Sequence, residues 1–250
     1  MRAMILAAGL GTRLRPLTND RPKALVEVAG HTLLEITLLR LASFGIRQVI
    51  VNVHHFADMV VDYLKKHDNF GVHVEFSREE ILLDTGGGLK RAAQFFLEGS
   101  AEEPFLLHNV DVISTIDLRQ MMQAHRENGA LATLAVQDRN TSRYLLFDQE
   151  NWLCGRRAGS DGKAEIVRPS SHPRAFAFSG VHVISPRFLS LMSEEGVFSI
   201  ITTYLRLAGQ GEKIGLFRAD DYYWSDLGKP ENVAQATADI EAHVLQLFGL

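Results

Sequence analysis

The sequence predicts an α/β fold, with a Rossmann-like, mainly parallel sheet flanked by helices and a smaller antiparallel lobe. Two observations support this fold class. Apolar runs of strand length alternate with amphipathic runs of helix length through the first half of the chain, as in consecutive βαβ units. From about Tyr144 to Val183 the runs are shorter and are separated by glycines, which is typical of antiparallel strands.

The first half begins with a predicted strand at Arg2 to Ala7, followed by a loop rich in glycine and proline. Thr32 with Glu35 three residues later forms a capping box, which predicts a helix that Gly45 ends. Gln48 to Val53 contains consecutive β-branched residues, as expected for a strand covered on both faces.

The same alternation predicts the following elements. A helix is expected near Ala57 to Lys66 and a strand near Val72 to Phe76. Thr85 is expected to cap a helix that reaches about Phe96. Near the other end, Lys229 to Phe248 is expected to form a closing helix.

A fourth strand is predicted at Pro104 to His108, and its carboxyl end would deliver Asn109 and Asp111. In open α/β sheets ligands bind at the carboxyl ends of the strands. We therefore expect the loops after the first and fourth strands to face one crevice.

Composition excludes several classes of protein. The 250 residues are 46% hydrophobic with a formal net charge of −4, which argues against the broad basic field of a nucleic-acid binder. The single cysteine, Cys154, excludes an internal disulfide and indicates a reducing compartment. The apolar run near the amino end is too short to span a bilayer. We expect a cytoplasmic protein that binds neither nucleic acid nor membrane.

The stretch from Ala7 to Lys23 combines features of a polyphosphate site. Its two glycines let the backbone approach a ligand closely, while Arg13 and Lys23 supply positive charge. A dinucleotide fingerprint would need a third glycine where Leu14 stands, and a Walker loop would need lysine after Gly11. A simple glycine turn with exposed basic residues would also explain so short a glycine pattern.

The whole stretch from Leu6 to Leu25 resembles LAAGxGTRLxPLTxxxPKxL, the signature of the sugar-1-phosphate nucleotidyltransferase family. The resemblance continues at Trp224 to Glu231 and so covers essentially the full chain. It is closest to the short bacterial members that make UDP-N-acetylmuramic acid or GDP-mannose. The family has a fold of the nucleotide-diphospho-sugar transferase type.

The resemblance implies the reaction. A nucleoside triphosphate and a sugar 1-phosphate would give an NDP-sugar and pyrophosphate, with Mg²⁺ as cofactor. UTP with N-acetylmuramate 1-phosphate or a related hexose phosphate is expected, and GTP with mannose 1-phosphate is the alternative. Two further hypotheses are an inactive NDP-sugar-binding regulatory subunit and a cytidylyltransferase for phosphocholine-like substrates.

By the same resemblance, Arg13, Lys23 and Asp111 would be catalytic. Asp84 to Gly88 is similar to the segment that passes beside the nucleobase, although a helix N-cap with a flexible first turn would also explain it. The predicted nucleotide-binding residues are Leu6, Ala7, Ala8, Gly9, Gly11, Thr12, Arg13, Lys23, Asp84, Thr85, Gly86 and Gly87.

The metal and the sugar would be bound by residues farther along the chain. Asp111 and Asp226 would hold Mg²⁺, which prefers a few carboxylates together with substrate phosphate oxygens. The predicted sugar-binding residues are Asn109, Glu165, Arg168 and Gly180. Val110 stands where the family usually has glycine, so we expect a backbone at this position without positive φ.

We expect one nucleotidyltransferase domain over residues 1–250, as a monomer or a small homo-oligomer. Residues 1–140 would form the nucleotide-binding half and residues 141–228 the sugar-side lobe with the second metal-binding aspartate. The closing helix would occupy residues 229–250.

Overall fold

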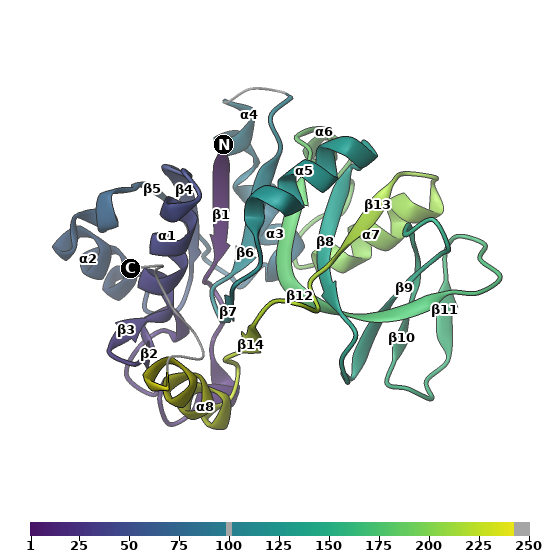
Figure 1. Cartoon of the computed structure of the whole chain (residues 1–250). Coiled ribbons are helices and arrows are strands. Elements are labelled where there is room, and N and C mark those ends of the chain that lie inside the picture. The colour runs from purple at the N-terminus through teal and green to yellow at the C-terminus, as the bar shows by residue number, and fades with distance from the viewer. Residues whose placement is uncertain (99–101, 243–250) are drawn as a thin grey trace. The chain divides into compact units, whose positions relative to one another are not determined.

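The computed structural model describes residues 1–98 and 102–242, and the chain forms two compact units. Unit 1 contains residues 1–83, 107–115 and the described chain from Tyr223 onward. Unit 2 contains the described residues of 84–106 and 116–222. Figure 1 shows the elements of both units with their labels.

Unit 1 is built on parallel strands, as the sequence predicts. Strand β1 (Arg2–Leu6) pairs with β4 (Gln48–Val53), and β4 pairs with β5 (His73–Arg78), in parallel. Strand β6 (Phe105–Asn109), whose last three residues belong to unit 1, neighbours β1 in the sheet order β6-β1-β4-β5. The carboxyl ends of β1 and β6 therefore lie next to each other.

Helix α1 (Leu33–Ser43) forms where the capping box predicts it. The Thr32 hydroxyl accepts a hydrogen bond from the N–H of Glu35 at 3.1 Å. The helix buries Leu34, Leu38 and Leu41 at helical spacing, and each contributes roughly 1.5–3 kcal/mol through burial.

The other elements of unit 1 surround this core. They are the 3-10 helices η1 (Thr12–Leu14), η2 (Lys23–Leu25) and η3 (Asp68–Gly71), the strands β2 (Glu27–Val28), β3 (His31–Thr32), β7 (Val112–Ser114) and β14 (Trp224–Asp226), and the helices α2 (Ala57–Lys66) and α8 (Pro230–Glu241). Helix α8 begins with Pro230 in its first turn, and the predicted continuation over residues 243–248 lies outside the described residues.

Unit 2 contains the predicted antiparallel lobe. Its strands are β8 (Ala132–Gln137), β9 (Arg143–Phe147), β10 (Leu153–Ala158), β11 (Ala164–Ile166), β12 (Arg174–Ile184) and β13 (Ile214–Arg218). They lie in the order β11-β10-β9-β12-β8-β13, and all neighbours are antiparallel except β8 and β13. The helices are α3 (Asp84–Arg91), α4 (Ala93–Leu97), α5 (Leu118–Asn128), α6 (Arg187–Ser190) and α7 (Ile200–Gly209).

The single helix predicted between Thr85 and Phe96 is wrong in two respects. The structure has two helices, α3 and α4, with a break at Ala92. Thr85 lies inside the first turn of α3, and its hydroxyl accepts a hydrogen bond from the N–H of Ile200 at 3.0 Å instead of capping its own helix. A contact between residues far apart in the chain thus replaces the local cap.

No helix within residues 1–98 and 102–242 has the length and apolar character needed to cross a membrane.

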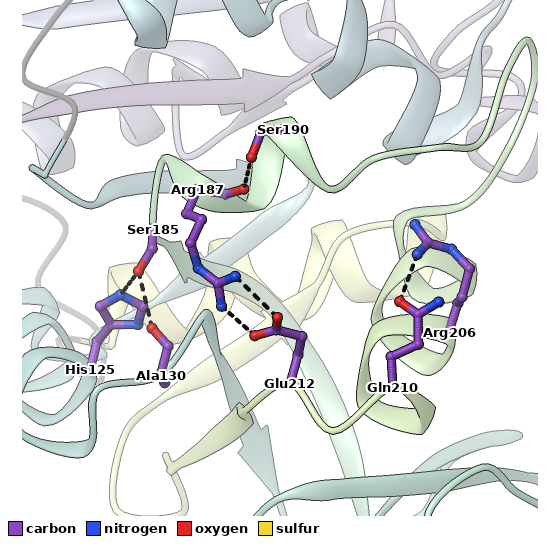
Figure 2. Close-up of polar contacts among 8 residues, drawn as sticks. All are labelled: His125, Ala130, Ser185, Arg187, Ser190, Arg206, Gln210 and Glu212. Atoms are coloured by element: carbon purple, nitrogen blue, oxygen red, sulfur yellow. Dashed lines mark hydrogen bonds and ion pairs between the residues drawn. The ribbon is translucent and has the colours of Figure 1, made fainter.

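His125 joins three elements of unit 2, as Figure 2 shows for its contact with Ser185. The hydroxyl of Ser185, after β12, donates to the carbonyl of Ala130 at 3.0 Å, so its oxygen accepts from Nε2 of His125 at 3.0 Å. Nδ1 of His125 then accepts from the hydroxyl of Thr133 on β8 at 2.9 Å. Burial of His125 lowers its pKa to about 4. His125 is therefore a neutral structural group at pH 7.

Acidification is expected to destabilise the protein through His125. Because the unfolded histidine has a pKa of about 6.5, the unfolded state binds more protons between pH 6.5 and 4, and stability falls as pH falls through that window. The free energy of unfolding should drop by about 2 kcal/mol from this group between pH 7 and pH 5. Urea titrations at both pH values should show a smaller drop for His125→Gln and an unchanged drop for His172→Gln, an exposed control. An equal drop in His125→Gln would contradict this assignment.

Candidate active site

The loop after β1 is anchored in unit 1 by a buried amide. The side-chain oxygen of Asn52 on β4 accepts hydrogen bonds from the N–H groups of Ala7 at 2.7 Å and Ala8 at 3.3 Å. The amide nitrogen of Asn52 donates to Glu79 at 2.7 Å, and both side chains are buried. The sequence analysis missed both residues, although a polar residue inside the β-branched run of β4 was a signal for Asn52.

The same loop needs glycine at position 11. Gly11 has φ of 65°, and a Cβ atom there would lie 2.9 Å from Cγ2 of Thr18. The Thr18 hydroxyl donates to the Gly11 carbonyl at 2.8 Å, which closes the loop on itself. Gly11 is thus required by backbone geometry, and it fixes the start of η1, which carries Arg13.

Lys23 and Asp111 are in direct contact. Lys23 begins η2, Asp111 follows β6, and the ammonium group is ion-paired with the carboxylate. Both side chains are largely shielded from water, with exposed fractions of 12% and 15%. The structure therefore brings together two of the three residues predicted to be catalytic.

Asp111 and Asp226 lie on neighbouring segments of unit 1. Strands β7 and β14 are antiparallel with Val112 opposite Asp226, and the carbonyl of Asp111 accepts from the N–H of Leu227 at 2.7 Å. The N–H of Val110 donates to the carbonyl of Leu6, and Val110 is not among the described residues with positive φ. The β-branched side chain is thus accommodated without the strain that positive φ would impose.

The carboxylate oxygens of Asp111 and Asp226 are ligands that suit Mg²⁺. Among the described residues, no group of three His, Cys, Asp or Glu side chains could hold a metal ion by themselves. Two carboxylates leave the remaining positions to phosphate oxygens and water, which is the arrangement Mg²⁺ prefers beside a polyphosphate substrate. Asp111 and Asp226 therefore fit the cofactor that the sequence predicts.

Gly228 lies close to the side chains of Arg13 and Asp226. Its N–H donates to Oδ1 of Asp226 at 2.8 Å. A Cβ atom at Gly228 would lie 2.8 Å from Nη2 of Arg13 and 2.8 Å from Oδ1 of Asp226. The absence of a side chain at position 228 thus lets the guanidinium and the carboxylate approach the same backbone segment.

Gly228→Ala is expected to lower kcat/KM of the pyrophosphate-releasing reaction that the sequence predicts by about 100-fold, because a displacement of about 1 Å at reacting groups has that effect. The clash falls on the far ends of two side chains, so the melting temperature should change by only a few degrees. Steady-state kinetics and thermal unfolding measure the two effects separately. Wild-type kinetics in this variant, or a loss of activity fully accounted for by unfolding, would contradict the role.

Asn109 and His108 lie at the carboxyl end of β6. The side-chain oxygen of Asn109 is buried without a hydrogen-bond partner among the described residues, which is consistent with a ligand contact. Burial lowers the pKa of His108 to about 4, and its Nδ1–H donates to the carbonyl of Asn109 at 2.8 Å. His108 is therefore neutral at pH 7.

The predicted nucleobase segment is packed within unit 2. The N–H groups of Gly86 and Gly87 both donate to the carbonyl of Phe198, at 2.9 and 3.2 Å. A Cβ atom at Gly86 would lie 2.4 Å from the Phe198 ring. Close packing against Phe198 thus explains a glycine at position 86 without a ligand.

The remaining predicted sugar-binding residues, all in unit 2, have different surroundings. Glu165 on β11 pairs with Arg156 at 2.6 Å. Arg168 has its Nε 3.8 Å from Asp148. Gly180 has φ of 75° and lies in β12 where the register with β8 shifts. The structure therefore does not bring Glu165 and Arg168 to a shared partner.

Comparison with known proteins identifies the family. The family described as nucleotidyl transferase matches residues 2–243. The chain is 34% identical to N-acetylmuramate alpha-1-phosphate uridylyltransferase of Caulobacter vibrioides, over 94% of this chain and 95% of that protein. It is 32% identical to mannose-1-phosphate guanylyltransferase catalytic subunit beta of Drosophila pseudoobscura pseudoobscura, over 92% of this chain but only 60% of that protein.

Solved structures agree with the fold. A putative glucose-1-phosphate thymidylyltransferase from Bacillus anthracis has a TM-score of 0.78 at 17% identity, over 99% of this chain and 98% of that chain. HddC from Yersinia pseudotuberculosis has a TM-score of 0.73 at 22% identity, over 96% and 99%. The protein is a transferase of the nucleotide-sugar-forming class. It belongs to the nucleotidyl transferase family, which confirms the resemblance found in the sequence.

Proposed function

We propose that the protein joins UTP to N-acetylmuramate 1-phosphate, with release of pyrophosphate. The observation that carries the proposal is the convergence in unit 1 of Lys23, Asp111 and the segment of Asp226 with a glycine loop. The choice of substrates is supported by the similarity to the Caulobacter uridylyltransferase over almost the full length of both proteins.

In this mechanism an oxygen of the sugar phosphate attacks the α-phosphorus of the triphosphate. The new P–O bond forms while the bond to the β-phosphate breaks, and pyrophosphate carries the electron pair away. Arg13 and Lys23 bind the phosphates and stabilise their charge. The attacking phosphate is already ionised, so no side chain has to act as a strong base.

We propose that Asp111 and Asp226 hold the Mg²⁺ ion, which when bound would neutralise charge on the transferred group. Loop 6–12 would contact the nucleotide, together with Asp84 to Gly87. Asn109, Glu165, Arg168 and Gly180 would contact the sugar. Residues 1–250 would form one nucleotidyltransferase domain, as a monomer or small homo-oligomer in the cytoplasm, where the buried free thiol of Cys154 stays reduced.

The test is a pyrophosphate-release screen of the four ribonucleoside triphosphates against several sugar 1-phosphates with Mg²⁺. The proposal expects the highest kcat/KM for UTP with N-acetylmuramate 1-phosphate. Preference for GTP with mannose 1-phosphate would support the guanylyltransferase activity that the Drosophila relative suggests. Tight binding of an NDP-sugar without pyrophosphate release from any pair would indicate a regulatory subunit.

A further inference from the structure

A hollow of about 590 Å³ lies within unit 2, along β9, β10, β11 and β12 and the start of α7. Its volume is in the range of small-molecule sites, roughly 300–1,000 Å³. The strand register explains its lining, because Arg156 lies opposite Leu145 on one side and Glu165 on the other. These three side chains therefore share one face of the sheet. The strands and α7 can be followed in Figure 1.

The lining of this hollow carries an excess of positive charge. Its cationic residues are Arg143, Arg156, Arg157 and Lys163, and Glu165 is the only carboxylate that the described residues contribute to it. The ion pair between Arg156 and Glu165 cancels one positive charge. Arg157 lies opposite Tyr144 and Ala164, on the other face of the sheet from Arg156, so the positive charges left on the Arg156 side of the hollow are those of Arg143 and Lys163.

Apart from Arg156, the cations of the lining are not paired with a carboxylate of the described residues. The guanidinium of Arg157 lies 5.4 Å from the centre of the Tyr144 ring, and its Nε donates to the carbonyl of Gly159. Neither contact cancels its charge. In the described part of the chain, the side chains of Arg143 and Lys163 have no carboxylate partner. Concave cationic surfaces of this kind attract anions.

We propose that Arg143 and Lys163 bind the carboxylate of an acidic sugar 1-phosphate and so determine the sugar specificity of the enzyme. This inference rests on the proposed function. A carboxylate carries a full negative charge that an unpaired guanidinium and an ammonium group can neutralise, whereas the hydroxyl groups of a neutral sugar ring cannot use that charge. The apolar side chains of Leu145 and Phe178 in the same hollow suit the carbon face of the sugar.

Calorimetric binding tests the proposal without requiring turnover. The probes are N-acetylmuramate 1-phosphate and N-acetylglucosamine 1-phosphate, which share the ring and the phosphate but differ by the lactyl carboxylate. The double variant Arg143→Gln/Lys163→Gln should bind the acidic sugar about 10–100-fold more weakly and the neutral sugar within about threefold of wild type. Arg126→Gln, an exposed cation on α5, is the matched control and should bind both sugars as wild type does.

Each of the remaining outcomes contradicts either the carboxylate-binding role of Arg143 and Lys163 or the proposed nucleotidyl transfer. Equal losses for both sugars would mean that these residues bind the phosphate, and unchanged binding would mean that they bind neither group. Either result, or a wild-type protein that binds neither probe, would overturn the inference. A wild-type protein that shows the expected binding but releases no pyrophosphate from any pair would instead refute the proposed function.

Discussion

Asp111→Asn is expected to lower kcat/KM for pyrophosphate release on the order of 1,000-fold. The change removes the negative charge that Mg²⁺ needs but keeps the size of the side chain. A bound metal supplies several kcal/mol of charge stabilisation, and each 1.36 kcal/mol corresponds to a factor of ten in rate. The fold should persist, because the backbone carbonyl of Asp111 still accepts from Leu227.

The control for this prediction is Asp62→Asn, an exposed carboxylate on α2 of the same unit. It should leave both kcat/KM and the urea midpoint unchanged. Near wild-type turnover of Asp111→Asn at saturating Mg²⁺ would show that Asp111 does not bind the metal. Titration with Mn²⁺ provides an independent readout, because the variant should bind this ion more weakly than the wild type.

Lys23→Met is expected to lower kcat/KM by about 100–1,000-fold, since the lysine is proposed to stabilise the phosphates in the transition state. It should also strengthen binding of Mn²⁺ to the nucleotide-free protein by about tenfold. In the structure the ammonium group of Lys23 is ion-paired with the carboxylate of Asp111, so a metal ion that binds this carboxylate has to displace the ammonium group. The variant leaves that carboxylate without a partner and open to the metal.

Two measurements separate these effects. Steady-state kinetics report the loss of phosphate stabilisation, and thermal unfolding with and without Mn²⁺ reports the gain in metal binding. Lys66→Met, which removes an exposed lysine from α2, should change neither. Unchanged metal affinity in Lys23→Met would show that the ion pair with Asp111 does not compete with the metal.

Local interactions explain why much of the fold could be predicted from the sequence. The capping box of Thr32 and Glu35 depends on residues three apart, and α1 begins where it predicts. The β-branched run of β4 and the glycine at position 11 are equally local signals. The failed prediction concerned Thr85, whose hydroxyl is engaged by Ile200, 115 residues away. A local rule could not anticipate that partner.

The sequence by itself determined the fold class, the family and the list of groups available for phosphate and metal chemistry. Only the tertiary structure decided how those groups are held. It pairs Lys23 with Asp111 and lets Asn52 accept hydrogen bonds from the loop after β1. It also brings Gly228 close to the guanidinium of Arg13. It also assembled the cationic hollow of unit 2 from four strands and the start of a helix. The physical reason is that hydrogen bonds, ion pairs and steric limits depend on distances in space, which spacing along the chain does not specify.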